Sequence, residues 1–304
     1  MGRERLAPLL EALAASVDPA ARIRADPVEF PRRYLDPRDQ EVSGLLSACL
    51  AYGRVELFKA KLEGLHAWMG PSPADFLRAL GPGEAARHLS GFSYRFNVGT
   101  DVAVLLLGMG AALRAHGSLE ALFARGFARS GGALQPALRA FSLALQETPR
   151  APLHRALGPE RGLHHLLPSA GAGGAFKRLN LYLRWMVRGP DGVDLGAWKT
   201  PSPAALVVPL DTHVARMARQ LGLTRRRDLG WRTAEEITAA LRGVDPADPT
   251  RFDFALCHFG MSGACPLKPS AEVCGRCPLL PACAPGQRRV QRAARLTRVT
   301  PRAG

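Results

Sequence analysis

Apolar residues recur at helix spacing through most of the 304-residue chain, and this periodicity constrains its fold more than any other feature. Leu6, Leu10 and Leu13 repeat in this way near the start, and so do the apolar residues of segments 42–49 and 55–65. Proline- and glycine-rich breaks separate further predicted helices at about 102–115, 134–147, 175–188, 211–221 and 233–242. No strand-like alternation of any length occurs. The sequence therefore predicts an all-α fold of many short helices.

Two apolar segments bear on export and on membrane insertion. Residues 1–17 place two arginines before an apolar stretch, as a signal peptide does, but Glu4 and Glu11 interrupt it, so we expect an amphipathic helix. The longest apolar run, 102–113, has twelve residues and is too short to cross a bilayer core of about 30 Å. We therefore expect a cytoplasmic protein with no membrane partner.

The chain is basic, with 41 Lys+Arg against 26 Asp+Glu and a formal net charge of +15. Alanine, arginine and leucine are abundant throughout, as a GC-rich genome would produce, so the total charge says little about partners. Its placement says more, because residues 284–304 contain no acidic residue and six arginines: Arg288, Arg289, Arg292, Arg295, Arg298 and Arg302. This basic tail is typical of phosphate binding, and the alternative is a disordered end that keeps the protein in solution.

The six cysteines form two groups. Cys49 and Cys257 lie on apolar helical faces and are predicted to pack in the core. The other four follow the pattern C-x8-C-x2-C-x5-C in a loop that contains proline and glycine: Cys265, Cys274, Cys277 and Cys283. Four thiolates this close predict a metal centre, because disulfides are disfavoured in a reducing cytosol. We expect a [4Fe–4S] cluster, with zinc as the alternative, because structural zinc sites usually pair two C-x2-C motifs and only one is present.

Several motifs occur in a fixed order. They are L-P-S-A-G-A-G-G at 167–174, K-R-L-N at 177–180, L-D-T-H-V-A-R at 210–216 and the cysteine loop. In this order they resemble the glycine-rich hairpin, the following helix, the V-D-T-H-V-x-R element and the iron–sulfur loop of the helix-hairpin-helix DNA glycosylases, of the endonuclease III and adenine glycosylase kind. The chain resembles an uncharacterised bacterial family, catalogued as a domain of unknown function, more closely than it resembles the glycosylases. The segments that carry this closer resemblance are 176–188, 192–196 and 209–213.

The resemblance implies an architecture of two helical domains around a cleft, with a C-terminal iron–sulfur loop. One domain spans 38–187 and ends in the hairpin and the helix after it. The second combines 1–37 with 188–283 and holds the four-cysteine loop, and the basic tail follows at 284–304. Residues 71–150 match no motif. We expect a monomer that binds double-stranded DNA.

The resemblance also implies roles for individual residues. Lys177 takes the position of a nucleophile that attacks C1′ of the sugar and forms a Schiff base. Asp211 takes that of a carboxylate that stabilises the sugar cation. By residue type alone, Asp211 suits a helix N-cap and Lys177 a solvated side chain. The residues assigned to DNA binding are Gly171, Gly173, Gly174, Arg178 and His213. The glycines would hold a phosphate through backbone N–H groups, or would simply cap a helix.

An enzyme that acts on a base inside a duplex must first flip it out of the stack. Residues 45–49 resemble the helix after which relatives carry a glutamine wedge, and Cys49 stands at that position here. The candidates for the wedge are Tyr52 and Arg54, and those for the base pocket are Tyr182, Trp185 and His213. Aromatic residues at helical spacing are more often part of the core.

These features together predict a DNA repair glycosylase with AP lyase activity that removes a damaged, oxidised base. Three alternatives keep parts of the pattern. The first is a non-catalytic protein that binds DNA or senses damage, the second an enzyme that acts on RNA or a modified nucleotide, and the third a zinc-stabilised interaction module.

Overall fold

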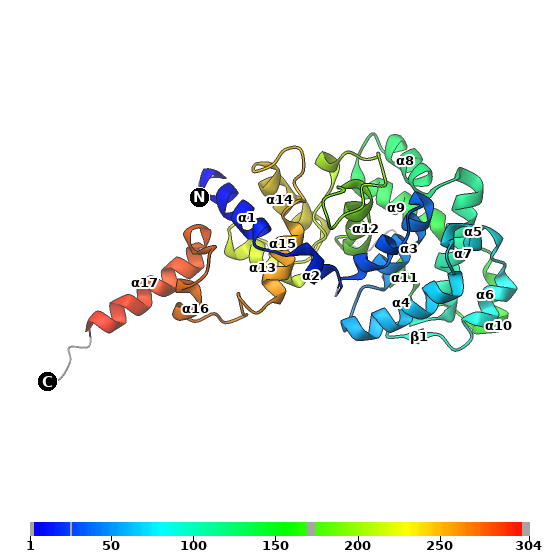
Figure 1. Cartoon of the computed structure of the whole chain (residues 1–304), viewed down its shortest axis with the longest axis horizontal. Coiled ribbons are helices and arrows are strands. Elements are labelled where there is room, and N and C mark those ends of the chain that lie inside the picture. The colour runs from blue at the N-terminus through cyan, green and yellow to red at the C-terminus, as the bar shows by residue number, and fades with distance from the viewer. Residues whose placement is uncertain (1–2, 25, 169–173, 300–304) are drawn as a thin grey trace. The chain divides into compact units, whose positions relative to one another are not determined.

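A computed structural model of the chain describes residues 3–24, 26–168 and 174–299. Within these residues the protein consists of α-helices, short 3₁₀ turns and one two-stranded hairpin (Figure 1). The predicted all-α class is confirmed. The chain divides into two compact units: unit 1 comprises Met1–Asp18, Gly173–Lys177 and Leu206–Gly304, and unit 2 comprises Pro19–Ala172 and Arg178–Ala205.

Unit 2 contains most of the helices. In chain order its elements are α2 (Pro19–Ile23), η1 (Pro27–Glu29), η2 (Pro31–Arg33), α3 (Pro37–Leu50), α4 (Val55–Met69), α5 (Pro73–Ala79), α6 (Pro82–His88), β1 (Ser93–Tyr94), β2 (Asn97–Val98), α7 (Gly99–His116), α8 (Leu119–Arg129), α9 (Leu134–Leu145), α10 (Arg150–Leu157), α11 (Leu163–Leu166), α12 (Lys177–Val187) and η3 (Pro203–Ala205). Lys177 itself is grouped with unit 1, and the rest of α12 with unit 2.

Helix α7 is the central helix of unit 2. It holds the longest apolar run of the sequence, nearly all of its residues are buried, and it packs against α5, α6, α8, α9 and α10. Two glycines allow this close packing, because a Cβ on Gly108 would lie 1.9 Å from the carbonyl oxygen of Leu145, and one on Gly110 would lie 2.2 Å from that of Leu77. Among the described residues no single helix is long and apolar enough to cross a membrane; α7 and α8 pass that test only as a pair bent by 79°.

Residues 19–37 and 188–205, which the sequence places in the second domain, pack in unit 2. The 188–205 loop is anchored by Asp194, whose fully buried carboxylate pairs with the guanidinium groups of Arg184, at 3.3 Å, and Arg188. The indole N–H of Trp198 also donates to Oε1 of Glu41 at 2.8 Å. Ion pairing and hydrogen bonding of buried groups thus decide where this loop belongs, and apolar periodicity does not reveal them.

Unit 1 is built from α1 (Arg3–Ala15), α13 (Thr212–Gln220), α14 (Trp231–Arg242), α15 (Asp253–Met261), α16 (Ala271–Gly275), η4 (Leu280–Ala282) and α17 (Ala284–Val299). Helix α15 packs against α1 and α13, and α17 packs against α16. The basic tail is helical over Ala284–Val299, so the alternative of a disordered end is wrong for these residues. Arg288, Arg292 and Arg295 are exposed on this helix.

Candidate functional site

Lys177 and Asp211, the two predicted catalytic residues, lie side by side in unit 1. Nζ of Lys177 is 3.4 Å from Oδ2 of Asp211. The lysine side chain is 41% exposed and the aspartate side chain 15%, so the amine is open to solvent and the carboxylate is partly shielded. The two residues are 34 positions apart in the sequence (211 − 177), and the fold brings them together.

The two carboxylate oxygens of Asp211 have different partners. Oδ1 accepts a hydrogen bond from the backbone N–H of Val214 at 2.8 Å and caps the N-terminus of α13, so the N-cap interpretation is confirmed. Oδ2 faces Lys177 and also accepts from the thiol of Cys257 at 3.6 Å. The cap fixes the side-chain orientation, and this orientation leaves Oδ2 facing the lysine. The capping role and the proposed chemical role are therefore compatible.

The residue before Lys177 has an unusual backbone conformation. Phe176 has φ of +50°, in the left-handed region that costs a non-glycine residue about 1–3 kcal/mol unless its surroundings impose it. Its ring is buried and meets that of Trp231 edge to face, with centroids 6.0 Å apart. Gly174 forms an isolated antiparallel bridge with Gly230, beside the tryptophan. These two contacts with the start of α14 set the point at which α12 begins, and so they position Lys177.

Cys257 belongs to this site, which the sequence did not indicate. It is only half-buried, and besides Asp211 its sulfur contacts Sδ of Met261 at 3.7 Å. The prediction of core packing is therefore wrong for Cys257, whereas Cys49 is fully buried and burial raises its pKa to about 12. Cys257 and Asp211 are 46 positions apart, and no local pattern connects them.

His213 and Arg216 hold α13 against α15. Both donate hydrogen bonds to the carbonyl oxygen of Gly260, His213 from Nδ1 at 3.2 Å and Arg216 from its guanidinium at 2.5 Å. A Cβ on Gly260 would lie 3.1 Å from Cβ of His213, so the two helices approach closely at this point. This packing keeps Asp211, at the start of α13, beside Cys257 on α15. The predicted role of His213 in DNA binding stays a prediction.

The other predicted residues have varied positions. Gly171 and Gly173 lie outside the described residues, and Gly174 is exposed in unit 1. Tyr182 and Trp185 are completely buried in unit 2, and Tyr182 packs against Trp198 with ring centroids 5.2 Å apart. This corrects their assignment to a base pocket: both are core residues, because α12 turns this apolar face inward.

The wedge candidates lie in unit 2 with Arg178. Arg54 is 78% exposed and lies 3.7 Å from Glu56, too loose a pair to fix its side chain. Tyr52 is half-buried, and the guanidinium of Arg178 lies over its ring at 4.7 Å. Of the two candidates, only Tyr52 is held in place by packing.

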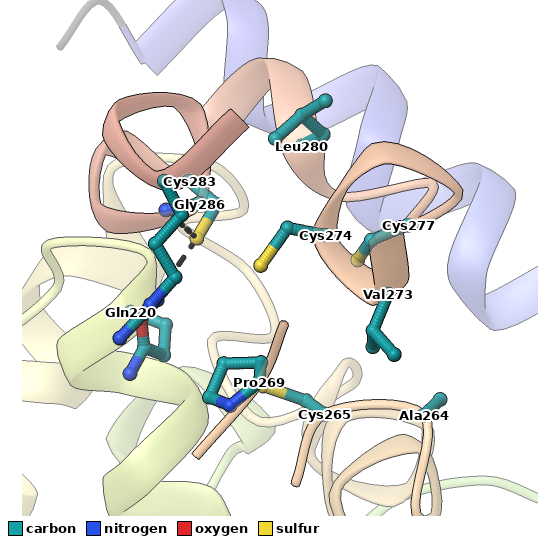
Figure 2. Close-up of a pocket in the computed structure, with 11 residues that line it drawn as sticks. Gln220, Ala264, Cys265, Pro269, Val273, Cys274, Cys277, Leu280, Cys283 and Gly286 are labelled. Atoms are coloured by element: carbon teal, nitrogen blue, oxygen red, sulfur yellow. Dashed lines mark hydrogen bonds between the residues drawn. The ribbon is translucent and has the colours of Figure 1, made fainter. Parts of the chain in front are cut away.

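The four predicted metal ligands line one pocket of unit 1 (Figure 2). Cys274 and Cys277 come from α16 and the turn after it, Cys283 from the C-cap of η4 just before α17, and Cys265 from the segment after α15. All four are free thiols. Among the residues that the structure describes, no three histidine, cysteine, aspartate or glutamate side chains converge closely enough to hold a single ion.

Burial and polar neighbours act in opposite directions on these thiols. Burial raises the pKa of Cys265 and of Cys277, which disfavours the thiolate form, and the guanidinium of Arg216 partly opposes this effect at Cys265. The backbone N–H of Gly286 donates to Sγ of Cys283 at 3.3 Å, the kind of bond that stabilises sulfur ligands of iron–sulfur clusters. The donor set and its hydrogen bonding therefore fit the expected cluster.

Helix α13 connects the cysteine pocket with the lysine–aspartate pair. Asp211 caps its first turn, and Gln220, its last residue, lines the pocket with its Oε1 3.9 Å from Sγ of Cys283. Nine helical residues span about 13 Å. One short helix therefore carries at its two ends the carboxylate that faces Lys177 and a residue that lines the cysteine pocket.

A family model described as "Protein of unknown function (DUF2400)" matches residues 26–262. The matched segment includes Lys177, Asp211 and Cys257 and ends before the first cysteine of the pocket. No curated protein and no solved structure matches the chain.

Proposed function

The chain belongs to this DUF2400 family of unknown function, and from its site we propose that it is a DNA glycosylase with AP lyase activity acting on double-stranded DNA. Lys177 is the nucleophile and Asp211 the carboxylate that stabilises the sugar cation. The observation that carries the proposal is the 3.4 Å contact between Nζ of Lys177 and Oδ2 of Asp211, in which an accessible amine meets a shielded carboxylate. The ordered motifs around both residues support it.

The chemistry requires both groups at one carbon. As the N-glycosidic bond breaks, the base leaves with the bonding electrons and positive charge builds on the sugar, where a carboxylate stabilises it. The amine of Lys177 then bonds to C1′ through its lone pair and loses a proton, which Oδ2 of Asp211 is close enough to accept. Oδ2 returns that proton to the ring oxygen as the sugar opens to a Schiff base. It then takes the C2′ proton, and β-elimination breaks the C3′–O bond and expels the 3′-phosphate. Oxidised bases are the proposed targets, by analogy with lysine-dependent members of the superfamily that the motifs resemble.

Unit 1 also offers a surface suited to the DNA backbone. Arg288, Arg292 and Arg295 are exposed on α17, the helix that begins just after Cys283. Exposed arginines on one helix bind phosphates without reading the sequence. They therefore support binding to DNA and leave the choice of base to other residues.

We propose that Cys265, Cys274, Cys277 and Cys283 hold a [4Fe–4S] cluster, with zinc as the alternative. When bound, the cluster would tie Cys265, in the segment after α15, to the three cysteines of the α16–η4 region, which already packs against α17. Analysis of the purified protein for iron, acid-labile sulfide and zinc distinguishes the two metals, and only the iron cluster gives a brown colour.

Borohydride trapping tests the catalytic proposal. The protein is incubated with duplexes that each carry one oxidised base or an abasic site, and the products are separated on denaturing gels. We expect a covalent adduct with the wild type, none with Lys177→Ala, and an unchanged adduct with Lys199→Ala, which removes an exposed lysine elsewhere. Asp211→Asn keeps an oxygen for the Val214 cap, so the protein should melt normally while base excision falls about 100-fold or more.

The remaining outcomes separate the alternatives. Strand breaks that appear only after alkali would mean base excision without a lysine nucleophile. Folded protein that binds the duplexes but leaves every strand intact would contradict the enzymatic proposal and favour a protein that binds DNA. Preferential competition by RNA would favour the enzyme of RNA or modified nucleotides.

A further inference from the structure

The β1–β2 hairpin of unit 2 presents an aromatic ring to solvent. Its strands pair Ser93 with Val98 and Tyr94 with Asn97, so Arg95 and Phe96 form the tip. Arg95 has φ of +51°, a left-handed conformation that a tight two-residue turn requires. Phe96 is 52% exposed, unusually so for a phenylalanine on a short ordered turn.

The base of the hairpin is rigid. Asn97 is fully buried, accepts a hydrogen bond from the hydroxyl of Tyr52, and donates from Nδ2 to the carbonyl oxygen of Gly162 at 2.8 Å. The hydroxyl of Tyr94 donates to the carbonyl oxygen of Tyr52. The exposed ring therefore stands on a fixed support.

Other rings and two cations gather around Phe96. Its ring lies 4.7 Å from that of His165 and is nearly parallel to that of Tyr52, at 6.4 Å and 7°. The ring of His164 lies against that of His165, tilted by 41° with centroids 4.0 Å apart. The guanidinium of Arg95 lies 5.6 Å from the Phe96 ring centroid, and that of Arg178 lies over Tyr52. The aromatic patch is defined by these six residues: Tyr52, Arg95, Phe96, His164, His165 and Arg178.

The electrostatics of the patch favour an anionic ligand with flat rings. The nearby carboxylate of Asp101 is buried and accepts hydrogen bonds from the backbone N–H groups of Val98, Arg161 and Gly162, so it points away from solvent. Burial, together with the neighbouring His164 and Arg178, lowers the pKa of His165 and so disfavours a charge on its ring. The patch thus combines aromatic π faces with two guanidinium groups.

We propose that the aromatic patch binds the bases of an unpaired DNA strand by stacking, with Arg95 and Arg178 attracting its phosphates. Aromatic faces with adjacent arginines are the usual means by which proteins hold single strands, because every base has a π face and every nucleotide a charge. The choice of DNA over RNA rests on the proposed function, since base extrusion leaves unpaired bases in a duplex. The stacking itself rests on the geometry of the patch.

Binding measurements on the full chain test this proposal without any catalytic step. Fluorescence anisotropy follows the binding of a labelled oligothymidine strand, an abasic strand of equal length, a fully paired duplex and an oligouridine strand. We expect Phe96→Ala to weaken oligothymidine binding about 5- to 150-fold, and Phe96→Trp to retain it. Leu143→Ala is the matched control, because it also removes an exposed apolar side chain from unit 2, on α9.

The remaining arms identify the contact. The abasic strand should bind the wild type and Phe96→Ala equally weakly, because it has the phosphates without the bases, and the duplex should not distinguish the two proteins. Phe96→Ala that binds oligothymidine as tightly as Leu143→Ala, with melting unchanged, would overturn the proposal. Tighter binding of oligouridine than of oligothymidine would overturn the assignment to DNA. A Phe96 effect without any borohydride adduct or alkali-revealed strand break would refute the proposed function and leave the patch supported. An adduct without any Phe96 effect would support the proposed function and refute the patch.

Discussion

His66 should make the stability of unit 2 depend on pH, and removing its titration should remove its share of that dependence. The side chain is buried on α4, where its ring stacks on Phe30 with centroids 4.8 Å apart. Nδ1–H donates to the carbonyl oxygen of Leu62 at 2.8 Å, so Nε2 is the unprotonated nitrogen and accepts from the hydroxyl of Ser43 at 2.7 Å. Burial lowers the pKa of His66 to about 4. A second proton on the ring would go to Nε2. It would create a buried positive charge and break the hydrogen bond that the Ser43 hydroxyl donates to that nitrogen.

The magnitude and the sign follow from the two pKa values. The unfolded chain protonates this histidine below about 6.5, whereas the folded chain does so only near 4, so the unfolded state binds more protons between these values. The stability that His66 contributes is therefore complete above pH 6.5 and falls as the pH drops through the window. The full loss amounts to about 3 kcal/mol, of which about 2 kcal/mol has gone by pH 5.

Urea unfolding at pH 7 and pH 5 measures this loss, with circular dichroism and tryptophan fluorescence as probes. His66→Gln keeps a donor and an acceptor but cannot titrate, so it should lose about 2 kcal/mol less than the wild type between the two pH values. Ser43→Ala removes the hydroxyl and keeps the histidine, so it should retain the pH dependence. Carboxylates elsewhere titrate equally in the wild type and both variants, so their contribution cancels when the pH-dependent losses of stability are compared. Equal losses in His66→Gln and the wild type would refute the reasoning.

Three further predictions concern stability and the metal centre. Asp194→Asn removes a buried carboxylate that lies between two arginines. It should lower the free energy of unfolding, measured in urea, by about 3–5 kcal/mol. The control is Asp191→Asn, at a more exposed carboxylate beside Arg188, and it should change that free energy by about 1 kcal/mol or less. Gly108→Ala places a Cβ 1.9 Å from a carbonyl oxygen of α9, so it should lower the free energy of unfolding by about 3 kcal/mol or more. At Gly126 the nearest atom to a new Cβ is 3.6 Å away, so Gly126→Ala should raise that free energy by up to about 1 kcal/mol through the helix propensity of α8. Cys274→Ala should remove the brown colour and speed amide hydrogen exchange in α13 and α17, whereas unchanged exchange would contradict the cross-linking role.

Most helices could be predicted because their signals are local. The segment predicted at 134–147 is α9 (Leu134–Leu145), and the one predicted at 211–221 is α13 with its cap. The short helices α5 and α6 both begin with proline at the first position, which is a local signal of a helix start. The β1–β2 hairpin was missed because strands of two residues are too short to show alternation.

The candidate site was only partly predictable. Motif resemblance pointed to Lys177 and Asp211, but periodicity alone would have left them a solvated lysine and an N-cap. Tyr182 and Trp185 were assigned to a base pocket although their helical spacing suited the core, and the core is where they lie. Phe96 and His165, which carry the aromatic patch, belong to segments without any motif.

Turn residues, caps and apolar periodicity act over a few neighbouring positions, so local sequence accounts for most of the helices and for the spacing of the four thiols. The meeting of distant groups depends on the folded chain as a whole. The tertiary structure placed the thiol of Cys257 against Asp211 across 46 positions, and it anchored the 188–205 loop through the buried Asp194. Such contacts depend on the path of the backbone between the two residues and on the burial of charge. The spacing of side chains along one helix predicts neither property.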